Sequence, residues 1–198
     1  MKLRLIFATN NRHKVDEIQK ALPAEFEITT LREAGIEIDI PEPYETLEEN
    51  AATKAETIFQ LTQADGFAED TGLEVHALNG APGVRSARFA GEHANFEENN
   101  QLLLDLMKDH EDRRARFRTV IHLIQNGEAH RFEGICNGRI AAAASGTKGF
   151  GYDPLFIPEG SNRCFAEMSM EEKNTFSHRR KALDAMLQFL REANEMNK

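Results

Sequence analysis

The chain of 198 residues has little cysteine and no long apolar run. Its two cysteines, Cys136 and Cys164, lack the spacing of a metal site or a redox pair, so we expect both to be reduced and structural. The apolar segment Leu3–Ala8 contains an arginine and is too short for a signal peptide. No stretch approaches the roughly 18 apolar residues that cross a membrane. We therefore expect a cytoplasmic protein without a membrane partner.

Positive charge is also scarce. The chain has 24 Lys and Arg residues against 33 Asp and Glu residues, which gives a formal net charge of −9. Proteins bind long nucleic acids largely by neutralising phosphates with basic side chains, so this balance argues against a nucleic-acid polymer as partner. A small phosphorylated ligand is still compatible with it, because a local basic pocket can outweigh a distant negative field.

Several common catalytic motifs are missing. The sequence has no Walker A loop, and Gly149-Phe150-Gly151 lacks the third glycine and the strand-to-helix context of a dinucleotide fingerprint. No Ser–His or Cys–His nucleophile pairing is readable. The sequence therefore gives no indication of a covalent nucleophile.

Helical and strand periodicities alternate along the chain, which indicates one α/β domain over residues 1–198. Asn126-Gly127 predicts a type I′ hairpin, which makes the sheet mixed. The expected helices cover about residues 12–22, 46–65, 95–108 and 177–193, and the expected strands are 3–8, 26–30, the hairpin strands 117–123 and 130–136, and a buried strand over 67–69 and 73–78 that its polar residues interrupt.

Three polar segments carry groups that bind anions or metals. Thr9–Lys14 follows a strand and opens a helix, so its backbone and side-chain donors form either an anion site or an ordinary helix cap. Glu42 lies in a loop stiffened by flanking prolines, where it could hold a metal ion. Glu69 and Asp70 stand between apolar strand residues, which seldom tolerate an unpaired carboxylate; this favours binding of Mg²⁺ or activation of water.

The segment Gly149–Pro154 places two aromatic residues in a glycine loop, an arrangement that suits stacking on a flat base. Lys14, Lys54 and Lys173 together with Mg²⁺ would neutralise a small ligand with several phosphates inside an acidic protein. Judged alone, Arg179 is equally compatible with a solvated helix residue.

Seven short motifs follow one another in the chain: Thr-x-Asn-x-x-Lys at 9–14, Ile-Pro-Glu at 40–42, Glu-Glu-Asn-Ala at 48–51, Asp-Thr-Gly-Leu at 70–73, Pro-Gly-Val-x-Ser-Ala-Arg at 82–88, Gly-Phe-Gly-Tyr-Asp-Pro at 149–154 and Glu-Lys-Asn-x-x-Ser-His-Arg at 172–179. One such motif would be weak evidence, but the ordered set is specific. Over about residues 8–182 the chain resembles the inosine triphosphate pyrophosphatase family, which hydrolyses noncanonical purine nucleoside triphosphates.

The resemblance implies a long bent mixed sheet flanked by helices, two lobes with an active-site cleft between them, and a homodimer. It also implies cleavage of ITP, dITP or XTP to the monophosphate and pyrophosphate, with Glu42 and Asp70 binding Mg²⁺ and Asp70 accepting a proton. The implied substrate-binding residues are Thr9, Asn10, Asn11, Arg12, His13, Lys14, Lys54, Thr71, Phe150, Gly151, Tyr152, Asp153, Lys173, His178 and Arg179. Arg179 is expected to donate to the 6-oxo group of the base.

The sequence departs from the family pattern at Glu69, where a second aspartate is common, and at Pro43-Tyr44, where Thr-Gly is usual. Two other functions are left open. A Maf-like nucleotide pyrophosphatase would act on other bases, but the motifs at 149–154 and 177–179 argue against it. A non-catalytic nucleotide sensor would not need the water-activating Asp70.

Overall fold

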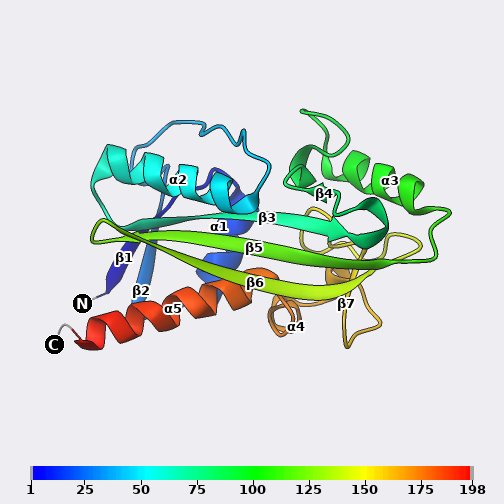
Figure 1. Cartoon of the computed structure of the whole chain (residues 1–198). Helices are drawn as coiled ribbons and strands as arrows, with labels where there is room; N and C mark the ends of the chain where they lie inside the picture. Colours follow the sequence, from blue (N-terminus) through cyan, green and yellow to red (C-terminus); the bar gives the residue numbers. More distant parts are fainter. Residues whose placement is uncertain (1, 197–198) are drawn as a thin grey trace. The chain divides into compact units, whose positions relative to one another are not determined.

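The computed structural model describes residues 2–196 and contains a seven-stranded mixed sheet flanked by helices (Figure 1). The strand order is β2-β1-β3-β5-β6-β7, and β4 pairs with β3. The strands are β1 Leu3–Phe7, β2 Phe26–Thr30, β3 Gly66–Val75, β4 Pro82–Gly83, β5 Arg114–Gln125, β6 Glu128–Ile140 and β7 Phe156–Pro158; the α-helices are α1 Arg12–Ala21, α2 Leu47–Thr62, α3 Phe96–Met107, α4 Met170–Asn174 and α5 His178–Met196. The predicted α/β class with a mixed sheet is confirmed.

The chain divides into two compact units. Of the described residues, unit 1 contains 2–70, 119–134 and 179–196, and unit 2 contains 71–118 and 135–178. Strands β3, β5 and β6 each contribute residues to both units. The expected arrangement of one catalytic domain with two lobes stays a prediction.

Unit 1 is a sheet covered on both faces. Strand β1 pairs in parallel with β2 and with β3. On one face, Ala55 and Ile58 of α2 pack against Ile124 of β5. On the other face, α1 and α5 pack against the β5 side chains that point away from α2. Leu183 of α5 and Ile121 of β5 lie in one buried cluster there. Parallel strands with both faces covered explain why β1 reads as an apolar run.

Strand β3 is continuous from Gly66 to Val75, so the interruption expected at its polar residues is wrong. The carboxylates of Glu69 and Asp70 have cationic partners in unit 1, so the strand needs no turn to expose them. Gly72 allows a close approach, since a Cβ there would lie 2.6 Å from the carbonyl oxygen of Gly83. The strand also ends earlier than expected, because His76–Leu78 forms a 3₁₀ turn.

The predicted hairpin is confirmed. Asn126 and Gly127 have φ angles of 52° and 79°, as a type I′ turn requires, and the strands beside them extend further than predicted. The four long predicted helices are confirmed to within about one turn, whereas the short elements β4, β7 and α4 were not predicted.

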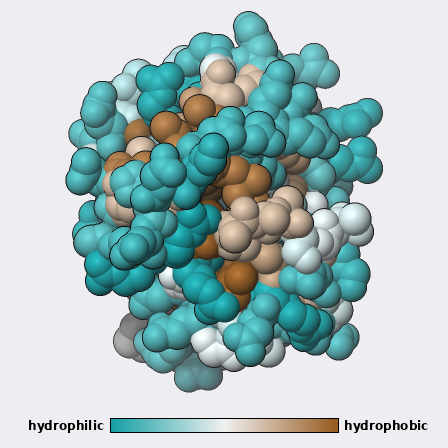
Figure 2. Space-filling model, turned by 90° about the vertical axis from the view of Figure 1, so that its right-hand side faces the viewer, coloured by the Kyte–Doolittle hydropathy of each residue, from teal (hydrophilic) through white to brown (hydrophobic). Residues whose placement is uncertain are grey.

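The core of unit 2 contains aromatic residues from several elements, with Phe117, Phe156 and Phe165 packed together. Cys136 and Cys164 are free and buried in this unit, as expected of structural thiols. The face shown in Figure 2 is mostly hydrophilic, with hydrophobic residues gathered near its middle. Within residues 2–196, no helix has the length and apolar character needed to span a membrane.

Candidate active site

The parallel register of β1 and β3 brings two of the predicted segments together. Phe7 pairs with Phe67, and the amide of Ala8 donates to the carbonyl oxygen of Phe67 at 2.8 Å. The polar segment after β1 therefore begins beside Glu69 in β3. At this point Asn11 caps helix α1, and its side chain accepts from the amide of Lys14 at 3.2 Å. The cap is thus present, and phosphate binding by the same segment stays a prediction.

Seven charged side chains in unit 1 form two ion-pair networks, which meet at the consecutive residues Glu69 and Asp70 of β3. One network contains Lys14, Glu17, Glu69 and Arg179, and the other contains Glu42, Lys54 and Asp70; we call the two together the ion-pair cluster. It holds four carboxylates and three cations. All except Lys14 and Glu42 are buried, and these two are partly exposed. The cluster therefore has one negative charge in excess. A bound divalent cation would make its net charge positive, and a positive net charge favours the binding of a phosphate.

Glu69 is fully buried and bridges two cations of the ion-pair cluster. Its carboxylate accepts from Arg179 Nε at 2.8 Å and lies 3.2 Å from Lys14 Nζ. Burial alone would raise the pKa of Glu69, but Arg179 and Lys14 outweigh it and hold that pKa at about 2. Glu69 is thus ionised at neutral pH and occupied by cations, which explains how a glutamate is accommodated at this position.

Arg179 is buried between Glu69 and Glu17, to which its Nη1 donates. Two of its nitrogens are therefore directed at carboxylates of unit 1. The hypothesis that Arg179 donates to the base stays a prediction.

Asp70 is 6% exposed, and burial raises its pKa above the usual value although Lys54 and Lys14 oppose the shift. Its Oδ1 lies 3.5 Å from Lys54 Nζ. Lys54 stays charged because Asp70 and Glu42 outweigh its own desolvation and raise its pKa. The result is a buried carboxylate with more affinity for a proton than an exposed aspartate has.

Glu42 is positioned from a distance by Asn50 of α2. Asn50 is 1% exposed, and its side chain accepts from the amide of Tyr44 and donates to the carbonyl oxygen of Tyr44, both at 3.1 Å. This double hydrogen bond fixes the proline-flanked loop, and Glu42 then pairs with Lys54. The Tyr44 side chain itself is 45% exposed. The departure from the family pattern at Tyr44 therefore leaves the loop's anchor intact.

The donor set fits Mg²⁺. Asp70 Oδ2 is buried and has no hydrogen-bond partner among the described residues. Buried polar atoms are usually paired, so this oxygen is a candidate ligand for a metal ion. Mg²⁺ commonly takes one or two protein carboxylates and fills its other positions with water and phosphate oxygens. Asp70 and Glu42 would supply those carboxylates. No group of three or more His, Cys, Asp or Glu side chains within residues 2–196 could hold a metal alone.

Unit 2 contains the aromatic loop, which we define as Gly149–Asp153. Asp153 closes it on itself, because its Oδ2 accepts from the amide of Phe150 at 3.0 Å and from Lys173 Nζ at 2.6 Å. The Nζ of Lys173 also lies 5.5 Å from the centroid of the Phe150 ring. Tyr152 is buried and donates its hydroxyl to the carbonyl oxygen of Ser86 at 2.7 Å. Phe150 is only partly buried and so suits a stacking role better than Tyr152.

Two glycines of the aromatic loop allow a matched test of the Asp153 contact. A Cβ at Gly149 would lie 1.9 Å from Asp153 Oδ2, whereas a Cβ at Gly151 meets nothing within 4 Å; both residues have positive φ. Gly151→Ala should lower the free energy of unfolding by only about 1–2 kcal/mol, the usual cost of a non-glycine residue in the left-handed conformation. We expect Gly149→Ala to lower the free energy of unfolding by clearly more, as measured by urea denaturation. Equal losses would contradict this account of the loop.

The remaining predicted residues are distributed over both units. In unit 1, Asn10, Arg12 and His13 are exposed, and Thr9 Oγ1 accepts from the amide of Asn11. In unit 2, Thr71 lies in β3 and the buried ring of His178 stacks on Phe117 with centroids 4.5 Å apart. The predicted residues thus form one group in each unit, and their role in binding substrate stays a prediction.

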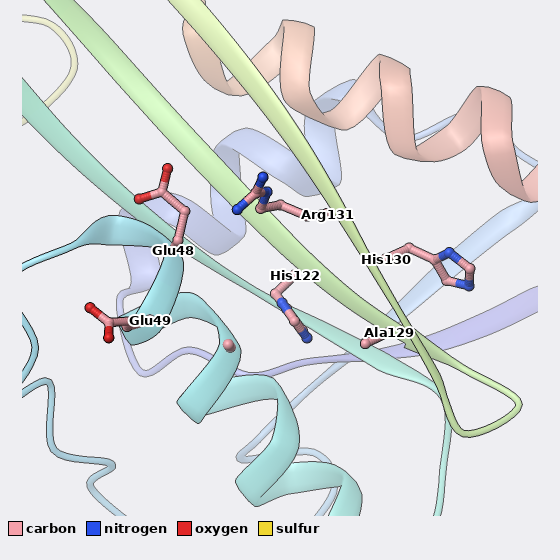
Figure 3. A pocket seen from close by; sticks show the side chains of 7 residues that line it. Glu48, Glu49, His122, Ala129, His130 and Arg131 are labelled. Carbon is pink, nitrogen blue, oxygen red and sulfur yellow. The ribbon is translucent and has the colours of Figure 1, made fainter.

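A pocket of about 410 Å³ lies elsewhere in unit 1, between α2 and the β5–β6 hairpin (Figure 3). It is lined by Glu48, Glu49, Ala52, His122, Ala129, His130 and Arg131, none of which is a predicted site residue. Burial lowers the pKa of His122. The pocket therefore adds nothing to the ion-pair cluster.

Glu17 and Asn50 are functional candidates that sequence reasoning missed. Glu17 is three residues after Lys14 on α1, so both lie on one helix face, and that spacing was the available signal. Asn50 stands in the Glu-Glu-Asn-Ala motif at 48–51, and that motif was the available signal.

Comparisons with known proteins agree over nearly the whole chain. A model of the Ham1 family matches residues 5–189. The dITP/XTP pyrophosphatase of Porphyromonas gingivalis is 50% identical, over 94% of this chain and 97% of the relative, and that of Flavobacterium johnsoniae is 45% identical, over 95% and 98%. The solved Ham1 protein of Staphylococcus aureus is 36% identical with a TM-score of 0.87, covering 96% of this chain and 99% of that one. The chain belongs to the Ham1 family.

Proposed function

We propose that this chain hydrolyses noncanonical purine nucleoside triphosphates, such as dITP, ITP and XTP, to the monophosphate and pyrophosphate. The observation that carries the proposal is buried Asp70, with one carboxylate oxygen unpartnered and the other beside Lys54. The printed name of its curated relatives, dITP/XTP pyrophosphatase, supports the substrate class.

In this proposal the residues of the ion-pair cluster bind phosphates and move a proton. Lys14 and Lys54 neutralise phosphate oxygens, and Asp70 accepts the proton of the water that attacks the α-phosphorus. Such a displacement depends on charge stabilisation and a positioned base more than on covalent catalysis. Because burial raises its pKa, Asp70 is a stronger base than an exposed aspartate. The purine base stacks on Phe150.

We also propose that the enzyme depends on Mg²⁺, held by Glu42 and Asp70. When bound, the ion supplies positive charge that stabilises the transferring phosphoryl group. Removing divalent ions with EDTA should abolish turnover of ITP, and excess Mg²⁺ should restore it; the measurement is pyrophosphate release before and after dialysis. Full activity in the metal-free protein would contradict the metal role.

A panel of substrates tests the proposed activity. Pyrophosphate release is measured side by side with ITP, dITP, XTP, ATP and GTP in the presence of Mg²⁺, and we expect turnover of the first three to exceed that of ATP and GTP. Turnover of other bases alone would favour a Maf-like specificity. Tight binding of ITP without hydrolysis would favour a nucleotide sensor.

A homodimer in the cytoplasm is the form we propose for the active protein, and light scattering of the purified chain tests the dimer.

A further inference from the structure

Helix α3 contacts the aromatic loop through two residues on one face. Phe96 and Asn100 are four positions apart, so both side chains lie on the same side of the helix. The Phe96 ring lies 6.1 Å from that of Phe150, centroid to centroid, and Asn100 Nδ2 donates to the carbonyl oxygen of Gly151 at 3.0 Å. One helix face thus contacts the backbone and the ring of the loop.

The Asn100 amide is held in one orientation at a cost. Only its NH₂ group can donate to the Gly151 carbonyl, so Oδ1 must point the other way. There Oδ1 is buried and has no hydrogen-bond partner among the described residues. A buried acceptor without a partner is unfavourable, and an apolar side chain of similar size would avoid it. The hydrogen bond from Asn100 to Gly151 is therefore accompanied by an unsatisfied acceptor, Asn100 Oδ1.

The hydrogen bond reaches a part of the loop that has open space beside it. Gly151 has a φ of +61°, and nothing lies within 4 Å of where its Cβ would be. On either side of it the loop is already held, by the Asp153–Phe150 contact and by the hydroxyl of Tyr152 on Ser86. Asn100 supplies an anchor for the Gly151–Tyr152 peptide group, directly after Phe150.

We propose that Asn100 is a positioning residue for the purine base, which sets the orientation of Phe150 by fixing the Gly151 carbonyl. This inference rests on the proposed function, because it assumes that Phe150 stacks on the base. It adds that base affinity depends on a side chain that does not touch the substrate. Ligands that carry a base should therefore depend on Asn100, and ligands made of phosphate alone should not.

The variant Asn100→Leu removes the donor and the unsatisfied oxygen together. We expect KM for ITP and the inhibition constant of inosine monophosphate to rise roughly 3- to 10-fold, the size of one lost hydrogen bond. The inhibition constant of pyrophosphate and kcat should change less than twofold. The melting temperature should change little, because removing the unsatisfied Oδ1 offsets the loss of the donor to the Gly151 carbonyl. Gln101→Leu, at an exposed neighbouring position, is the matched control and should match wild type in every constant.

The outcomes separate this inference from the proposed function. If wild type hydrolyses ITP and Asn100→Leu has unchanged constants, or loses affinity for pyrophosphate as much as for inosine monophosphate, the positioning role is overturned and the proposed function stands. If Asn100→Leu melts at a lower temperature, Asn100→Asp is assayed at pH 8, where an ionised carboxylate keeps the shape without the donor. It must show the same selective loss for inosine monophosphate, or the role is overturned. If wild type neither hydrolyses ITP nor binds inosine monophosphate, the proposed function itself fails.

Discussion

Replacing Asp70 by asparagine is expected to lower kcat for ITP roughly 10²- to 10⁴-fold, the loss typical of an acid–base group. The amide keeps the size of the side chain but cannot accept the proton of the attacking water. The fold should not suffer. Burial raises the pKa of Asp70, which means that ionising it opposes folding at neutral pH. We therefore expect an unchanged or slightly higher melting temperature beside the loss of pyrophosphate release.

The control for this prediction is Asp16→Asn, an exposed carboxylate of helix α1 for which we expect wild-type kinetics. Near-wild-type turnover in well-folded Asp70→Asn would remove Asp70 from the mechanism. A loss of activity that only follows a loss of folded protein would likewise contradict its role as a base.

Replacing Arg179 by methionine is expected to destabilise the protein by about 3–5 kcal/mol, the range found when one partner of a buried ion pair is removed. Glu69 and Glu17 would then lack the guanidinium that binds both of them. Urea denaturation measures the loss. Arg180→Met is the matched control, since Arg180 is partly exposed and pairs with Asp184 one turn along α5, so we expect less than about 1 kcal/mol there.

The loss at Arg179 should depend on pH. In the folded wild type the pKa of Glu69 is about 2, below the roughly 4.3 of a glutamate in an unfolded chain. Its ion pairs therefore stabilise the fold fully above about pH 4.3, and this stabilisation is lost as the pH falls toward 2. Without Arg179, burial is opposed only by Lys14 and the pKa of Glu69 rises. We expect the difference in stability between wild type and variant to narrow from pH 8 to pH 5. A constant difference would mean that the carboxylates are not the cause.

Local patterns in the sequence predicted what depends on local contacts. The Asn126-Gly127 turn and the helix cap in the segment Thr9–Lys14 involve residues close in sequence, and the structure has both. The ordered motifs predicted the family, which the comparisons confirm. Segments whose form depends on distant partners were less predictable, as the continuity of β3 through Glu69 and Asp70 shows.

The ion-pair partners in the candidate site could not be predicted from the sequence for the same reason. Arg179 meets Glu69 across 110 positions of sequence and Glu17 across 162, and no local periodicity encodes such a pairing. The sequence suggested a metal role near Glu69, whereas the structure occupies that carboxylate with two cations. Asn100 contacts the backbone carbonyl of Gly151, 51 positions away, and no local pattern around either residue predicts that hydrogen bond.

Hydrolysis of ITP in ¹⁸O-labelled water tests the central claim most directly, because it reports which phosphorus the water attacks. The products are separated and analysed by mass spectrometry. We predict inosine monophosphate and pyrophosphate in equal amounts, with one ¹⁸O atom in the monophosphate and none in the pyrophosphate. Release of inosine diphosphate and phosphate, or label found in the pyrophosphate, would contradict attack at the α-phosphorus.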